Sequence, residues 1–215
     1  MSWVSEHRSD VLQWVVTAVI VVLLLGGGLA YWEVRSSAAE TALGDAMDTY
    51  SAQLLAPGAP AENGSYATAA ERTKAANQKF VAVVKDFGWL PEGTKAHYFA
   101  GVTYEEMGQN GSAETELKAA AGSWNPDLKN LAKMALAGLY RQTSRDAQAI
   151  AIYNEITAKP SATVPAPMAQ LALADLYVGE GKPELAKAVW AKIKDTDKDG
   201  MAGSIASQKL AGKQQ

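Results

Sequence analysis

Hydrophobic and polar positions divide the chain into one long apolar run near its start and a series of short amphipathic segments after it. Residues 11–32 contain no charged side chain. At about 1.5 Å per residue, a helix of this length extends roughly 33 Å, enough to cross the hydrocarbon core of a bilayer. Trp14 lies near one end and Tyr31 and Trp32 at the other, where aromatic rings favour the headgroup level. We therefore predict a transmembrane helix over 11–32, after a short N-terminal flank, 1–10.

A cleavable signal peptide is the alternative for this segment. It is disfavoured because the flank mixes Arg8 with Glu6 and Asp10, and because the apolar run is longer than the core of a typical signal peptide. The glycines at 26–28 either allow another helix to pack closely or form a flexible exit from the span. Arg8 and Arg35 nearly balance the two ends, and the amino group favours an N-terminus inside with the large domain outside.

The pattern of apolar residues over 33–93 predicts a membrane-proximal helical hairpin. Its first helix, 36–55, continues from the span, and its apolar residues recur at spacings of three and four: Ala39, Leu43, Met47, Tyr50 and Leu54. A Pro/Gly loop, 56–65, ends this helix. A second helix runs from Ala67 to Phe87, and Pro91 is expected to close the unit. The apolar stripe of that second helix consists of Ala76, Phe80 and Val83.

One apolar pattern recurs three times between residues 94 and 195, at intervals of about 36 residues. Each copy contains a tyrosine: Tyr104, Tyr140 and Tyr177. A small residue stands three positions before it, at Gly101, Ala137 and Ala174, and a turn former four positions after it, at Gly108, Ser144 and Gly181. Alanine follows at nine positions (Ala113, Ala149, Ala186), a bulky residue at thirteen (Leu117, Tyr153, Trp190), and Ala120, Ile156 and Ile193 at sixteen. Each copy predicts two helices joined by a tight turn.

These matched positions resemble the tetratricopeptide repeat, whose usual period is about 34 residues. The resemblance implies stacked helix hairpins, because a single hairpin cannot bury both of its faces. We therefore expect an all-α chain: one N-terminal transmembrane helix followed by a tetratricopeptide-like α-solenoid of antiparallel helix hairpins. The tyrosine and bulky positions are assigned to the core.

The first helix of each repeat keeps a second, partly polar face. In the tetratricopeptide family the corresponding face lines a concave groove, and the resemblance implies a partner-binding surface made of Tyr98, Glu105, Leu131, Met134, Arg141, Met168, Leu171 and Asp175. Apolar residues, scattered charges and two methionines suit an apolar or extended polypeptide. The alternative is that these side chains pack against the membrane-proximal helices or a terminal helix.

An acidic segment follows the repeats. Asp195, Asp197 and Asp199, followed by Gly200, match the first half of a calcium-binding loop. The twelfth position of such a loop supplies a bidentate carboxylate, but here it is Ala206. We therefore interpret the segment as a solvated turn, and the three aspartates remain a weak candidate for a metal site.

Residues 196–215 comprise this turn and a C-terminal capping helix. The helix is expected from Met201 to Leu210, and Ile205 and Leu210 are expected to cover the last hairpin.

Composition excludes several classes of function. The net charge is -3 and no run of Lys or Arg occurs, which argues against binding of nucleic acid. The chain has no cysteine, so it offers neither disulfides nor thiolate metal ligands. The two histidines, His7 and His97, are far apart in the sequence, and no phosphate-binding, nucleophile or metalloprotease motif is present. We predict neither an enzyme nor a cofactor.

The whole arrangement resembles the YfgM family of bacterial inner-membrane proteins, ancillary subunits of the SecYEG translocon. The resemblance covers nearly the whole chain and rests on the span ending in Tyr31 and Trp32, the alanine-rich helix after it, and the repeats. It implies a single-pass inner-membrane protein with its N-terminus in the cytoplasm and its repeats in the periplasm. The implied partners are translocon subunits, a membrane-anchored chaperone and unfolded clients leaving the translocon.

Two other hypotheses come from different classes of function. In one, the chain is a structural scaffold subunit of a particular membrane complex, and its span packs against other helices through residues 26–28. In the other, it is a calcium-responsive module that uses Asp195, Asp197 and Asp199.

Overall fold

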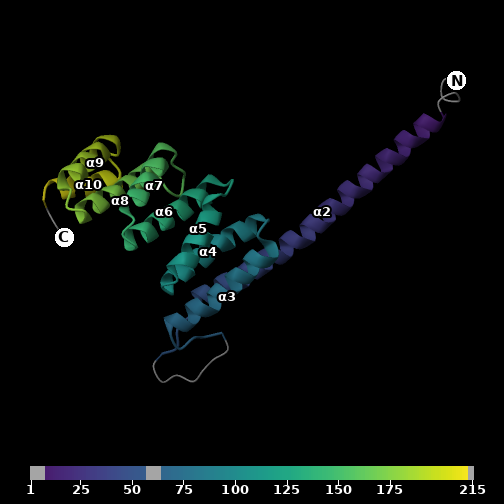
Figure 1. Ribbon diagram of the computed structural model, residues 1–215, viewed down its shortest axis with the longest axis horizontal. Coiled ribbons are helices and arrows are strands. Elements are labelled where there is room, and N and C mark those ends of the chain that lie inside the picture. The colour runs from purple at the N-terminus through teal and green to yellow at the C-terminus, as the bar shows by residue number, and fades with distance from the viewer. Residues whose placement is uncertain (1–7, 57–63, 213–215) are drawn as a thin grey trace.

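The computed structural model describes residues 8–56 and 64–212, and within these ranges the protein is all-helical. Nine helices hold 80% of the described residues, and neither range contains a strand. The first helix extends far from the rest, while the others stack in chain order (Figure 1). The predicted all-α class is confirmed.

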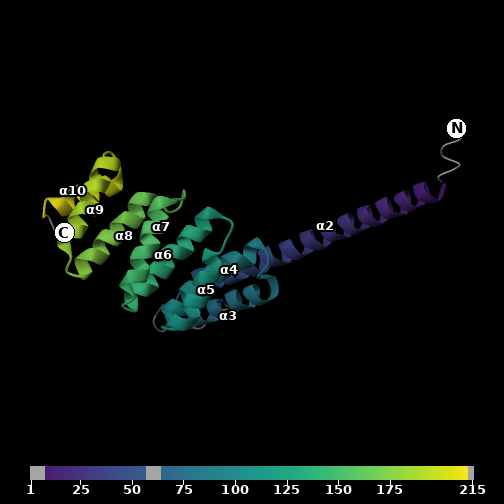
Figure 2. The same ribbon diagram turned by 45° about the horizontal axis from the view of Figure 1, so that its top comes forward.

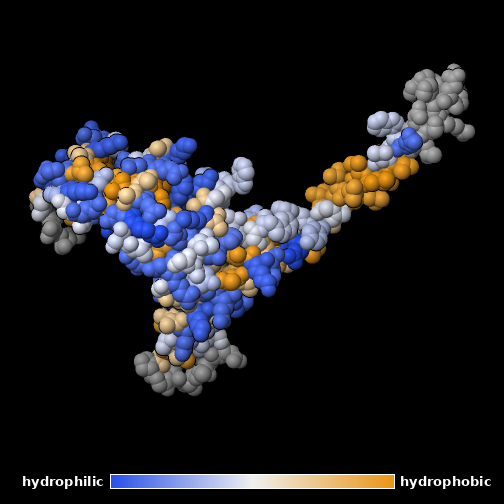
Figure 3. All heavy atoms as spheres, in the orientation of Figure 1, coloured by the Kyte–Doolittle hydropathy of each residue, from blue (hydrophilic) through white to orange (hydrophobic). Residues whose placement is uncertain are grey.

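α2 (Arg8–Ser51) is one unbroken helix that passes from the apolar run into the first hairpin. Its large side chains from Trp14 to Leu29 are exposed, whereas Ala39 and Ala46 are fully buried. The apolar half has a mean hydropathy of 2.2, none of it is buried, and by length and composition it is able to cross a membrane. Figure 3 shows this half as a continuous hydrophobic band. The predicted continuity between span and hairpin is confirmed.

The helix ends at Ser51, four residues before the predicted end at Leu55. The backbone there turns to pair with a distant segment, because the N–H of Leu55 donates to the carbonyl of Tyr66 over 2.9 Å. Most of the predicted Pro/Gly loop, residues 57–63, lies outside the described residues.

Two sequence signals set the starts of the next two helices. α3 (Ala69–Phe87) begins after Thr68, whose hydroxyl accepts a hydrogen bond from the N–H of Glu71. Pro91 does not close the hairpin as predicted; it begins α4 (Pro91–Glu106). Proline suits the first turn of a helix, where no intrahelical partner exists for an N–H. The first repeat therefore starts three residues earlier than expected.

The remaining helices follow at short intervals: α5 (Asn110–Ala121), α6 (Pro126–Gln142), α7 (Asp146–Ala158), α8 (Ala166–Gly179), α9 (Pro183–Thr196) and α10 (Met201–Leu210). Each packs mainly against its neighbours in the sequence, an order that is also visible in the rotated view (Figure 2). The three predicted repeats correspond to the pairs α4–α5, α6–α7 and α8–α9.

The turn within each pair is built in the same way. Its turn former adopts the left-handed conformation, with φ of 72° at Gly108, 57° at Ser144 and 71° at Gly181. The residue after it donates its backbone N–H to the carbonyl of the repeat tyrosine, over 2.8 Å at Tyr104, 2.7 Å at Tyr140 and 2.8 Å at Tyr177. This pattern closes the carbonyl end of a helix and reverses the chain. The predicted turn positions are confirmed.

The matched apolar positions form the core. The residues that stand nine, thirteen and sixteen positions after each repeat tyrosine are buried in all three copies. The three small residues that precede the tyrosines are buried as well. The tyrosines differ: Tyr140 is 3% exposed, whereas Tyr104 and Tyr177 are partly exposed. Gly101 is required to be small, because a Cβ there would lie 2.7 Å from Cγ of Leu117. The closeness of the paired helices therefore depends on small residues.

α10 covers the last hairpin, but not through the predicted side chains. Gly203 and Ala206 are buried in the contact, whereas Ile205 is partly exposed and Leu210 is exposed. The carboxylate of Asp197 accepts the backbone N–H of Gly203 over 3.0 Å. A Cβ at position 203 would collide with the backbone carbonyl of Asp197. The close approach that this hydrogen bond needs is therefore possible only with a small residue at this position of α10.

Replacement of Tyr140 by alanine is expected to lower the free energy of unfolding by about 2–5 kcal/mol, because a buried ring is lost. Urea unfolding of the full chain in detergent, followed by circular dichroism, measures the change. Tyr177→Ala is the matched control and is expected to cost less, since Tyr177 is partly exposed. Equal losses in the two variants would contradict the assignment of Tyr140 to the core.

Candidate protein-interaction surface

The eight residues predicted to bind a partner lie on the first helix of each pair. α4 carries Tyr98 and Glu105; α6 carries Leu131, Met134 and Arg141; and α8 carries Met168, Leu171 and Asp175. We call this set the interaction face. Arg141, Met168 and Asp175 are exposed, whereas the other five are partly buried.

The partly buried members also support the core. Tyr98, Leu131 and Met134 pack against the buried cluster that links α5 to α8. Leu171 packs against the cluster beneath α10. Part of the predicted surface is therefore occupied by contacts within the chain, and the exposed members are the ones available to another molecule. Binding of a partner stays a prediction.

The hydroxyl of Tyr153 on α7 is influenced by charged residues of α6 and α8. The pKa of Tyr153 on α7 is raised chiefly by burial, while Arg141, which lies within hydrogen-bonding reach of the hydroxyl, opposes the rise. The negative charge of Asp175 adds to the rise in the pKa of Tyr153. A hollow of about 320 Å³ lies beside it, lined by Gly138, Arg141 and Gln142. Sequence reasoning placed Tyr153 only in the core; the signal it overlooked is a hydroxyl at a position that is Leu117 or Trp190 in the other copies.

Tyr98 and Glu105 form a second titratable pair, at the α4 end of the face. Burial is the main cause that raises the pKa of both groups, and the charge of Glu105 adds to the rise at Tyr98. The neighbouring Glu106 points elsewhere: it accepts hydrogen bonds from Tyr50 over 2.6 Å and from Thr73 over 2.9 Å. Glu106 therefore holds α2, α3 and α4 together.

The acidic segment does not gather its aspartates. Asp195 lies within α9, and the carboxylate of Asp197 is used to cap α10. Among the described residues, no group of three His, Cys, Asp or Glu side chains is placed to hold a metal ion.

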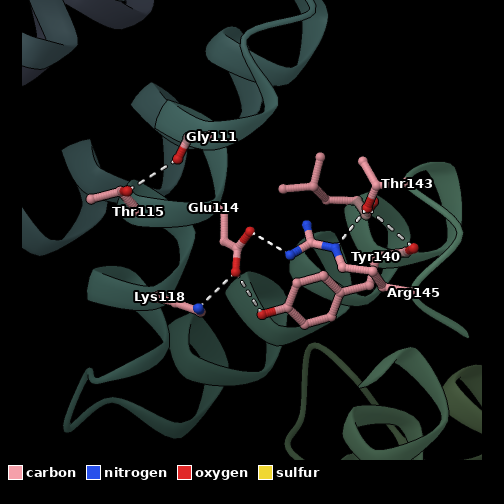
Figure 4. A network of polar contacts seen from close by, with 8 residues as sticks. Gly111, Glu114, Thr115, Lys118, Tyr140, Thr143 and Arg145 are labelled. Carbon is pink, nitrogen blue, oxygen red and sulfur yellow. Dashed lines mark hydrogen bonds and ion pairs between the residues drawn. The ribbon is translucent and has the colours of Figure 1, made fainter. Parts of the chain in front are cut away.

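The most extensive ionic cluster joins two repeats (Figure 4). The carboxylate of Glu114 on α5 contacts Lys118 over 2.6 Å and Arg145 over 2.7 Å, and accepts a hydrogen bond from the hydroxyl of Tyr140 over 3.1 Å. The guanidinium of Arg145 also lies over the ring of Tyr140, 4.3 Å from its centre. Hydrogen bonds from Lys118, and then from Arg145, lower the pKa of Glu114 to about 2. This cluster fixes α5 against α6.

A second hollow of the described structure was not predicted. It measures about 680 Å³ and lies among Trp32, Trp89, Trp124 and residues of α4, α5 and α6. His97 lines it and contacts the carboxylate of Glu116 over 2.6 Å. A sequence signal existed, since Trp-x-Pro occurs at both Trp89 and Trp124.

Glu114→Gln is expected to destabilise the protein near neutral pH and to have a smaller effect in acid. The carboxyl of Glu114 has a pKa of about 2 when folded against an ordinary 4.5, so its contribution is full above that ordinary value and is lost as the pH falls toward 2. Urea unfolding of both proteins at roughly pH 6 and pH 3 measures the difference. Glu184→Gln, which breaks an exposed pair with Lys187, is the control and should change little at either pH. A Glu114→Gln effect that does not vary with pH would contradict this role.

The interaction face thus consists of three exposed side chains, Arg141, Met168 and Asp175, and five half-buried ones. Such a surface offers hydrogen bonds, charge and apolar contact. Comparisons of the chain with protein-family models, curated proteins and solved structures found no match in any of the three.

Proposed function

We propose that this chain is a membrane-anchored protein-interaction module whose helix pairs form a tetratricopeptide-like α-solenoid. The proposal rests on the continuity of α2. One unbroken helix has an unburied apolar half and a second half that packs against α3 and α4. An apolar helix of this length is unfavourable in water and suited to a bilayer. The recurring turns and buried small residues support the repeat assignment.

The interaction face fits an extended or apolar segment of polypeptide. Met168 and Val178 on α8 are 47% and 48% exposed, and Asp175 lies between them in the sequence with its side chain exposed. Methionine adapts its shape to different apolar partners. Arg141 and Asp175 add opposite charges that can pair with a polypeptide's own groups.

In this proposal the partners are translocon subunits, a membrane-anchored chaperone or unfolded clients. The protein sits in a bacterial inner membrane with its N-terminus in the cytoplasm and its helix pairs in the periplasm. The resemblance to the YfgM family supports this assignment, as does the order of span, hairpin and repeats along the chain.

A structural scaffold subunit is the second candidate, and one observation favours it. Residues 26–28 are helical, so they are not a flexible exit from the span, and a Cβ at any of the three glycines would meet nothing within 4 Å. Three consecutive glycines leave a short section of the apolar helix without side chains, which allows a neighbouring helix to approach closely. In this role the interaction face is permanently covered by one partner.

Photo-crosslinking from the interaction face tests the first candidate. A photoreactive residue at Met168 is expected to capture translocon subunits, a chaperone or nascent clients in cells. The matched control is position 185, since Leu185 on α9 is equally exposed, at 48%, but lies outside the interaction face. Equal capture from both positions would contradict a binding surface at Met168.

Gly27→Leu tests the scaffold candidate, because a larger side chain would hold a neighbouring helix away from α2. The scaffold role predicts that purification in mild detergent recovers one stoichiometric complex with the natural chain and loses it with the variant. Recovery of the same complex with Gly27→Leu would argue against this role. The membrane fraction of each protein, measured by sedimentation, controls for insertion.

A further inference from the structure

Three tryptophans gather where α2 leaves its apolar half. Trp32 lies on α2, Trp89 in the turn between α3 and α4, and Trp124 in the turn between α5 and α6. Their exposed fractions are 46%, 55% and 101%. Trp32 and Trp89 meet edge to face, with ring centres 5.3 Å apart. All three line the hollow of about 680 Å³, and we call them the tryptophan rim.

The path of the chain explains why these distant residues meet. α3 runs back along α2 toward the apolar half, and Arg35 fixes its end by donating to the carbonyl of Asp86 over 2.7 Å. The guanidinium of Arg35 also lies 4.6 Å from the centre of the ring of Phe87. α4 then leads away from this side and α5 returns to it. Figures 1 and 2 both show the α3–α4 and α5–α6 turns on the side of the array that faces the free half of α2.

The two turns share a sequence feature that packing does not require. Each has tryptophan two positions before the proline that begins the next helix, at Pro91 and at Pro126. The corresponding turn before α8 has Thr163 in that position before Pro165, and it carries no tryptophan. Trp124 contributes nothing to the core, because its side chain is fully exposed. Together with Trp32 and Trp89 it forms an exposed aromatic patch, and such a patch marks a site of contact with a protein or a membrane.

The headgroup layer of a bilayer is such an environment. Tryptophan favours this level because its ring is apolar and its N–H can still donate a hydrogen bond. Trp32 lies at the end of the apolar run, where the bilayer surface falls if α2 spans it. Glu33 and Arg35 begin the charged sequence immediately after it. The hollow between the rings is lined by Lys95 and His97, whose polar groups suit phosphate and water.

We propose that the tryptophan rim seats the α3–α4 and α5–α6 turns in the headgroup layer of the membrane that α2 crosses. The inference rests on the proposed membrane anchoring and adds a second, peripheral contact with lipid. Because α2 is one rigid helix packed against α3, the two contacts together fix how the helix pairs stand on the membrane surface.

Single-cysteine probes provide the test, since the natural chain has no cysteine. The full chain is purified and reconstituted alone in phosphatidylcholine vesicles, with an environment-sensitive fluorophore at one of three positions. Ala119→Cys reports on the hollow, which Ala119 lines from an exposed position. Leu185→Cys is the water-exposed control, and Val22→Cys reports on the span.

The expected result is a blue-shifted emission at position 119, with quenching by lipids that carry a nitroxide near the headgroup. Position 185 should remain accessible to a water-soluble quencher. Adding Trp124→Ser to the Ala119→Cys chain should reverse the shift without loss of helical structure, because Trp124 makes no buried contact.

Three results overturn the inference and can be told apart. If the probe at Val22 reports bilayer while the probe at Ala119 reports water, the anchoring holds and the tryptophan rim does not touch lipid. If the probe at Val22 itself reports water, the anchoring fails and the inference fails with it. A shift at Ala119 that survives Trp124→Ser also counts against the rim.

Discussion

The structure depends on the continuity of α2, which has two different surroundings along a single helical rod. Its first half presents large apolar side chains to nothing in the protein, and its second half buries Ala39 and Ala46 against α3 and α4. Within a bilayer, a helix satisfies its own backbone hydrogen bonds, so an unbroken helix is the favourable form even through three glycines. The same rod then serves as the first helix of the first hairpin. Any tilt of the free half is therefore transmitted to the array.

Both ends of the stack of hairpins are covered by other helices. A hairpin buries its second face only against a neighbour, so the first and last hairpins need covers of a different kind. At one end the α2–α3 hairpin covers the first repeat; Arg35 holds α2 to α3, and Glu106 of α4 accepts hydrogen bonds from both helices. At the other end α10 packs with Gly203 and Ala206 against α9. Between the ends, three similar turns reverse the chain with left-handed residues.

The sequence predicted features that depend on a repeated local pattern. It did not predict features that depend on contacts between residues distant in the sequence. The spacing of tyrosine, turn former and alanine is set inside each hairpin, so it can be read from the chain, and the structure buries the expected positions. Pro91 was assigned to the wrong helix because proline punctuates both the end of one helix and the start of the next. The face of α10 was misjudged because hydrophobicity favours Leu210, whereas the capping bond from Gly203 to Asp197 requires small residues.

For the residues of the interaction face, the helix that carries each one was predictable from the sequence, but its burial was not. Helical spacing places residues such as Tyr98 and Met134 on one side of their helices, but only the packing of neighbours shows that they are partly buried. The same holds for the Tyr153 hydroxyl, whose pKa is affected by Arg141 and Asp175 on two other helices. Trp89 and Trp124 were visible as a repeated Trp-x-Pro, yet their meeting with Trp32 follows from the return of α3 and α5 toward α2.

In the proposed arrangement, the tryptophan rim and the interaction face have different orientations relative to the membrane. The tryptophan rim lies at the turns that begin α4 and α6, so these helices start at the level where α2 leaves its apolar half. Residues late in the same helices, Glu105 and Arg141, therefore lie at the far ends from that level. A helix rises about 1.5 Å per residue, so the roughly ten residues that separate Leu131 from Arg141 correspond to about 15 Å along the helix. In the proposed arrangement, the apolar side chains of the interaction face lie closer to the membrane and its charged side chains lie farther out, the order expected for binding a polypeptide near the point where it leaves a bilayer.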